Sequence, residues 1–220
     1  MSRKTRLLRR SGQLAASAGV LASLLLPTGI LLLDHLNPQL NPVAAPISHM
    51  GAVGAPYAAA FNGLLAACAL LIAACALGLA GALRARHLAA WPAGLLAAFG
   101  LLGLGGSAAF HCRVGCEEVD LLGVLHFVPT TLGLVALLLA IAVMPGYLAA
   151  LGAGHRIQRL ALWAGHLLWG GTALYALAVL FHDNVLFPYI GLIQRIFILA
   201  FAIWLFAISM SMIKKPISDR

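Results

Sequence analysis

Six long apolar runs constrain this chain more than any other feature of its sequence. They lie near residues 12–33, 55–83, 89–110, 121–143, 160–181 and 190–213, separated by short segments that carry nearly all the charge. A helix needs about 20 consecutive apolar residues to cross a hydrocarbon layer roughly 30 Å thick. With 62% hydrophobic and 9% charged residues, a chain of 220 residues cannot present a polar surface to water on every side. The sequence therefore predicts an all-α, polytopic membrane protein built as a bundle of six transmembrane helices.

The distribution of lysine and arginine predicts how this bundle is oriented. Positive residues are enriched in the short segments on the cytoplasmic side of membrane proteins. In a six-span arrangement every lysine and arginine except Arg113 and Arg195 falls on one side. We therefore expect both termini to be cytoplasmic, with a basic N-terminus at 1–11, a membrane domain at 12–213 and a tail at 214–220. The formal net charge of +8 is then a topology signal, and nucleic acid is not an expected partner.

These patterns also predict the location and the first partners of the protein. We expect it to be a multi-pass protein of the cytoplasmic (inner) membrane, in contact with membrane lipids whose anionic head groups would attract the basic side. The basic start and apolar middle of residues 1–33 resemble a signal peptide. An uncleaved first span is favoured, because the apolar run continues to Leu33 and its removal would leave five spans.

The segment HCRVGCEEVD at residues 111–120 concentrates reactive side chains in the expected extracytoplasmic loop between the third and fourth spans. An oxidising compartment permits Cys112 and Cys116 to form a disulfide, although free thiols remain an alternative. A metal site is a further, weaker alternative, because no typical zinc spacing is present. Its candidate ligands are His111, Cys112 and Cys116 from this segment, with His182 and Asp183 from the last outer loop.

Polar side chains inside three spans indicate a candidate ligand site. Counting about 1.5 Å per residue from the outer helix ends places Asn62, His126 and Arg195 about 7–11 Å below the outer surface. Thr130 lies one turn below His126, and Gln194 adjoins Arg195. An ionisable group in hydrocarbon requires a partner or a water-filled cavity. We expect these five side chains to line a cavity in which Arg195 attracts an anionic group. The alternative is that Arg195 extends to the head groups and His126 bonds to a neighbouring backbone.

Two histidines within the spans raise the possibility of haem. His166 in the fifth span and His126 in the fourth differ in expected depth by roughly 13 Å, whereas axial ligands must flank one iron. Haem is therefore not expected, and the sequence identifies no other cofactor.

Small residues at a spacing of four occur in the second and third spans, at Gly78–Ala82 and Gly103–Ser107. This spacing lets helix backbones approach closely, so we expect these two spans to pack through it.

Several loose motifs, in order along the chain, resemble a known family. They are PISHMGAVGAPYAAAFNGLL, then CEEVD followed by GVLHFVP, then GLIQRIFILAFAIWL. Together they resemble the prokaryotic membrane family catalogued as domain of unknown function 998 (DUF998). The resemblance implies six spans, and the positions that match are Ile47, Ser48, Gly51, Ala52, Gly54, Pro56, Asn62, His126, Gly191 and Arg195. His49 stands where an acidic residue is common, so a carboxylate role there is not expected. The family label carries no established activity.

Three functions are compatible with these patterns. The favoured one is binding or transport of a small amphiphile or lipid through a polar cavity in the outer leaflet. One alternative is a membrane-embedded lipid hydrolase, with or without a metal, in which His126 is the general base. The other is a structural partner of another membrane protein. Whether the protein is an enzyme is left open, although no familiar nucleophile motif, H-E-x-x-H or phosphate loop occurs.

Overall fold

The apolar runs form long helices in the computed structural model, which describes residues 3–112, 121–181 and 184–213. Six helical segments are long and apolar enough to cross a membrane, as predicted, and no strand occurs in the described ranges. Five spans are single helices, and their bounds are α1 Arg3–Leu36, α2 Ala58–Arg84, α5 Leu121–Ala150, α6 His155–Leu180 and α7 Ile190–Ile213. The protein is therefore a multi-pass membrane protein with an all-helical fold.

The third span is assembled from three helical pieces that follow one another directly. These pieces are α3 Trp91–Ala98, a π-helical segment η2 Phe99–Gly105 and α4 Gly106–Ala109. Two short 3₁₀ helices, η1 Ile47–Gly51 and η3 Phe187–Tyr189, lie in loops.

One helix boundary differs clearly from the prediction. The fourth span was expected to end near residue 143, ahead of Pro145, but α5 continues to Ala150. A proline inside a helix removes only one backbone donor and crowds the carbonyl four residues earlier, so the chain can remain helical on both sides of it.

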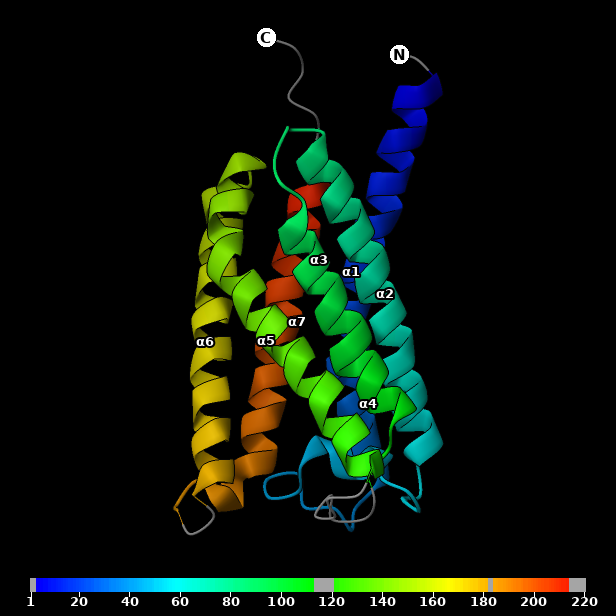
Figure 1. Ribbon diagram of the computed structural model, residues 1–220, viewed down its shortest axis with the longest axis vertical. Coiled ribbons are helices and arrows are strands. Elements are labelled where there is room, and N and C mark those ends of the chain that lie inside the picture. Colours follow the sequence, from blue (N-terminus) through cyan, green and yellow to red (C-terminus); the bar gives the residue numbers. More distant parts are fainter. Residues whose placement is uncertain (1–2, 113–120, 182–183, 214–220) are drawn as a thin grey trace.

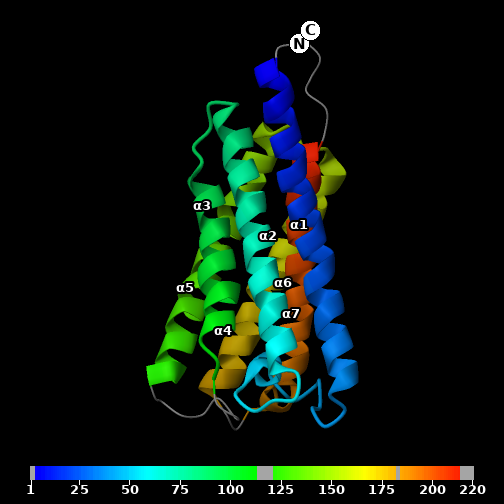
Figure 2. The same cartoon turned by 90° about the vertical axis from the view of Figure 1, so that its right-hand side faces the viewer.

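The six spans form a closed ring. Each span packs against the next in sequence, and α7 closes the ring by packing against α1 as well as α6. Figures 1 and 2 show that α1 begins at the same end of the bundle at which α7 ends. We call this the basic end, because α2 ends and α6 begins there, and the sequence at these helix ends carries Arg84, Arg86, Arg156 and Arg159. The opposite end, which carries the connection from residue 37 to residue 57, is called the loop end.

The two halves of the ring are filled differently. Towards the basic end its interior is packed with large buried side chains, including Phe201 and Trp204 of α7 and Leu137 and Met144 of α5. Towards the loop end α5 tilts away from α6, as Figure 1 shows. The two halves of the bundle therefore differ in how closely α5 follows α6.

Close helix crossings occur at the predicted small residues, but with other partners. A Cβ on Gly78 would lie 2.1 Å from the Cβ of Ala15, so α2 uses this position against α1. A Cβ on Gly133 of α5 would lie 2.4 Å from the backbone nitrogen of Gly103. The close packing expected at Gly78 and Gly103 is therefore present, but it is made with α1 and α5. The second and third spans do pack against each other, and Gly100 is the glycine that lies close to Ala69 and Ile72 of α2.

Candidate functional site

A cavity of about 620 Å³ occupies the loop-end half of the ring. We call it the loop-end cavity. Side chains from α2, the third span, α5, α6, α7 and η1 line it, and most of them are apolar. Phe127 and Val128 of α5 line it while being 67% and 46% exposed, so part of the cavity wall also belongs to the outer surface of the bundle. The cavity therefore adjoins the lateral surface of the bundle at α5.

Four of the five predicted ligand-site residues line this cavity. Asn62 reaches it from α2, His126 and Thr130 from α5, and Gln194 from α7. All four residues lie in the loop-end halves of their helices, so they are at similar distances from that end of the bundle. Arg195 is not among the lining residues.

His126 and Thr130 of α5 are held by hydrogen bonds within α5 and to the end of the third span. The Nδ1 of His126 lies 2.6 Å from the carbonyl oxygen of Phe110 and must donate to it, because a carbonyl can only accept. The Thr130 hydroxyl donates to the His126 carbonyl at 2.6 Å, which leaves its oxygen to accept from the Ser107 hydroxyl at 2.9 Å. The bond that fixes His126 to a neighbouring backbone was the alternative considered above, yet its ring also lines the cavity.

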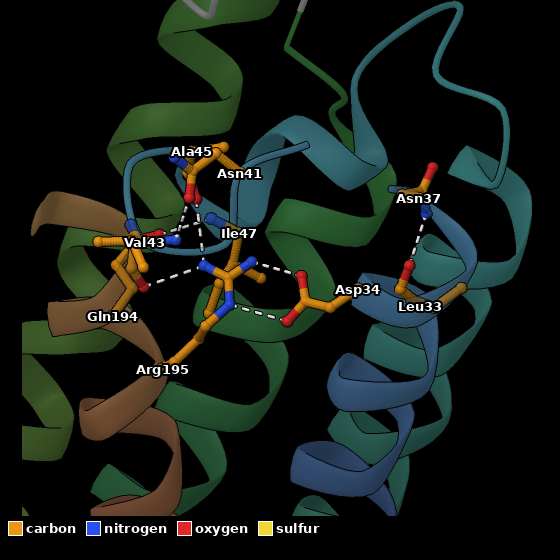
Figure 3. A network of polar contacts seen from close by, with 10 residues as sticks. Leu33, Asp34, Asn37, Asn41, Val43, Ala45, Ile47, Gln194 and Arg195 are labelled. Atoms are coloured by element: carbon orange, nitrogen blue, oxygen red, sulfur yellow. Dashed lines mark hydrogen bonds and ion pairs between the residues drawn. The ribbon is translucent and has the colours of Figure 1, made fainter. Parts of the chain in front are cut away.

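Arg195 is bound in an ion pair that the sequence analysis did not foresee. Its Nε donates to Asp34 Oδ2 at 2.8 Å, and its Nη2 donates to the other carboxylate oxygen. Its Nη1 donates to the carbonyls of Ala45 at 3.1 Å and Gly191 at 3.0 Å (Figure 3). The two side chains are only 12% and 11% exposed. Every nitrogen of the guanidinium is therefore engaged within the protein, and its charge is balanced by Asp34.

The sequence did contain a signal for this pair. Asp34 directly follows the apolar run of the first span, at the same end of the bundle as Arg195. An acidic residue at the end of one span and a basic residue at similar depth in another attract each other strongly, because the dielectric constant is low and each charge needs a partner. Asp34 was not among the side chains expected inside the spans, so its pairing with Arg195 was not predicted.

Neighbouring residues fasten the 37–57 connection to the bundle. The backbone N–H of Ile47 donates to Gln194 Oε1 at 2.6 Å, and the Asn62 side-chain amide donates to the Gly51 carbonyl at 3.1 Å. At Gly191 a Cβ would lie 2.4 Å from the Ala45 carbonyl oxygen, so only glycine lets the loop approach this closely. Four of these residues, Ile47, Gly51, Asn62 and Gly191, are among the positions that carried the family resemblance, which gives those positions a structural role.

The predicted metal and disulfide residues are only partly within the described ranges. Cys116, His182 and Asp183 lie outside them, so the disulfide between Cys112 and Cys116 stays a prediction. His111 lines the loop-end cavity, and its Nε2 donates to the Ala108 carbonyl at 2.8 Å. In the part of the chain that the structure describes, no three His, Cys, Asp or Glu side chains are grouped so as to hold a metal ion.

His166, the second histidine of the haem alternative, lies apart from this site. It is exposed on α6, where its Nδ1 donates to the Leu162 carbonyl at 2.7 Å. It lines a smaller depression of about 320 Å³ between α5 and α6, which His126 does not line.

Comparison with known families identifies the chain. Comparison with curated proteins and with solved structures found no match. Residues 20–211 match the family described as "Protein of unknown function (DUF998)". The match runs from within the first span to near the end of the sixth and includes most of the chain, so the chain belongs to the DUF998 family.

Proposed function

We propose that this protein binds or transports a small amphiphile or lipid in the loop-end cavity, within the outer leaflet of the cytoplasmic membrane. The single observation that carries the proposal is the cavity itself, whose volume of about 620 Å³ is typical of small-molecule sites, which span roughly 300–1,000 Å³. Its lining is mainly apolar, with a few polar groups that could orient a ligand.

In this proposal the ligand arrives from the membrane and enters the cavity past α5. The exposed lining residues Phe127 and Val128 are apolar, so a hydrocarbon chain would pass them without losing contact with apolar surroundings. The orientation follows from the basic residues, which favour the cytoplasm and thus place the loop end in the outer leaflet.

Arg195 has a different part in this proposal from the one expected from sequence. Because Asp34 neutralises it and the cavity lining does not include it, we propose that it anchors the 37–57 connection above the site. Gln194 and Asn62 combine both tasks, since each bonds to that connection and also lines the cavity.

A matched pair of glycines on α6 allows a direct test. Gly171 lines the cavity, and a Cβ there would meet its nearest neighbours, two atoms of Phe197, at an ordinary contact distance of 3.8 Å. Gly171→Leu should fill part of the cavity without moving backbone. Gly170 is the control, because it is exposed on the same helix and a Cβ there meets nothing within 4 Å.

The measurement is mass spectrometry of amphiphiles that remain with the protein after purification in mild detergent. The wild type and Gly170→Leu should retain the same amphiphile, and Gly171→Leu should retain about tenfold less, the effect of an overpacking penalty of roughly 1.4 kcal/mol. All three should show similar thermal stability. Equal retention in Gly171→Leu, or no retained amphiphile in any of them, would overturn the proposal.

A further inference from the structure

We infer that the ligand of the loop-end cavity has an uncharged head group bearing hydroxyl groups, such as a glycerol ester. This inference rests on the proposed function and narrows the chemistry of the same site. It replaces the anionic head group that the sequence suggested, and three features of the cavity carry it.

The polar lining offers neutral donors and acceptors next to one another. Asn62 uses its amide N–H on Gly51, which leaves its side-chain oxygen as an acceptor. Gln194 uses its oxygen on Ile47, which leaves its amino group, and its side chain interacts with the hydroxyl of Tyr175. Thr131 adds a further hydroxyl to the lining. A hydroxyl group both donates and accepts, so it suits such a mixed set better than a carboxylate or an ammonium group does.

The lack of carboxylate, lysine and arginine side chains in the described lining supports the same conclusion. Among the described lining residues none is Asp, Glu, Lys or Arg, and the two lining histidines, His111 and His126, each have one ring nitrogen bonded to a backbone carbonyl. Arg195, which adjoins the lining residue Gln194, has both carboxylate oxygens of Asp34 and two backbone carbonyls as partners. A charged head group moved into this lining would lose its hydration without gaining an opposite charge, which is a large penalty in a low-dielectric site.

The size of the cavity indicates how much of the ligand it holds. A methylene group is close in size to a water molecule, whose share of liquid volume is about 30 Å³. A volume of about 620 Å³ therefore holds on the order of 20 non-hydrogen atoms. That is the size of a small head group with a single acyl chain, so single-chain probes are the appropriate test.

The test compares probes that share one acyl chain and differ in the head group. A photoactivatable monoacylglycerol is crosslinked to the full-length protein in nanodiscs, and unlabelled competitors are added. The competitors are the monoacylglycerol, the acyl taurine with a permanent negative charge, the acyl choline with a permanent positive charge, and the methyl ester, which has no hydroxyl. We expect the monoacylglycerol to compete at concentrations at least about tenfold lower than the other three. A tenfold ratio corresponds to a difference of roughly 1.4 kcal/mol in binding free energy.

A conservative variant separates recognition of the hydroxyl from a purely structural effect. Tyr175→Phe keeps the ring and removes the hydroxyl that interacts with Gln194. It should weaken competition by the monoacylglycerol and leave competition by the methyl ester unchanged, because a site built to bond a hydroxyl loses only that contact. Equal weakening of both would overturn the role of the lining hydroxyls.

The outcomes distinguish this inference from the proposed function. If the acyl taurine or the acyl choline competes as well as the monoacylglycerol, and Gly171→Leu abolishes the crosslink, the cavity is a ligand site and the uncharged head group is wrong. If the crosslink does not map to α5, α6 or α7, or is the same in Gly171→Leu and Gly170→Leu, the proposed function fails and the inference fails with it.

Discussion

Asp34 and Arg195 are separated by 161 residues and meet through two parallel hydrogen bonds. In this bidentate geometry the planar guanidinium matches the carboxylate in shape as well as in charge. The two side chains are nearly buried. Removing one partner would leave a buried charge without a counter-charge, and this penalty affects stability more than the attraction within the pair does. At the scale of residues, the pair joins the end of α1 to the start of α7 and holds the connection from residue 37 to residue 57 between them.

A double-mutant cycle tests this role. Asp34→Leu and Arg195→Leu should each lower the free energy of unfolding in detergent by about 3 kcal/mol, because each leaves a charge without its partner. The double variant should lose much less than the sum, since leucine is accepted in an apolar surrounding. Thermal or denaturant unfolding of the purified protein measures all three. Strictly additive losses would show that the two residues act independently.

At the scale of elements, α5 determines the shape of the cavity. It carries Pro129 and Pro145 within the helix, and it crosses the third span where Gly133 meets Gly103. From that crossing its loop-end half diverges from α6, as Figure 1 shows, and supplies a large part of the cavity lining. Gly103, the partner of Gly133 in this crossing, belongs to the π-helical segment η2. Such segments tend to occur at functional sites.

The crossing gives an element-scale prediction with an internal control. Gly133→Ala should destabilise the protein by about 1–3 kcal/mol and reduce ligand retention, because its Cβ would meet the backbone of Gly103 and push α5 away. Gly146→Ala lies on the same helix, where a Cβ meets nothing within 4 Å, and should be neutral or slightly stabilising. Thermal unfolding and amphiphile retention, measured side by side, check both variants. Indistinguishable behaviour of the two would contradict a tight crossing.

At the scale of the whole molecule, the bundle has one filled half and one hollow half. Large buried side chains such as Phe201 and Trp204 pack the ring towards the basic end, and the cavity occupies the loop end. A hollow near one surface with a closed opposite half is the shape expected of a protein that takes a ligand from a single leaflet. Which leaflet this is depends on the orientation in the membrane.

Reporter fusions test that orientation. A reporter fused after Arg220 should be active only in the cytoplasm, and one inserted near Glu118 should be active only on the extracytoplasmic side. Cysteine accessibility at Ala44, in the connection from residue 37 to residue 57, provides an independent readout from outside the cell, since this residue is exposed. The opposite pattern would place the cavity in the inner leaflet and would contradict the proposed function.

The sequence alone determined the elements of this protein. Apolar runs of membrane length must become helices in hydrocarbon, because every backbone polar group has to be bonded within its own segment. Depth along a helix is also readable from sequence at a fixed rise per residue, and Asn62, His126, Thr130 and Gln194, which this counting placed towards the outer side, line one cavity. The family resemblance, carried by ordered motifs, was confirmed over residues 20–211.

Only the tertiary structure decided which side of each helix faces the cavity and which partner each polar group takes. Rotation about a helix axis depends on contacts between segments far apart in sequence, so depth could not reveal that Arg195 turns to Asp34 and away from the cavity. The same limit hid the partners of Gly78 and Gly103, which face Ala15 and Gly133. A nearly uniform apolar composition gives almost no signal for helix rotation, and packing of specific small and large side chains supplies it instead.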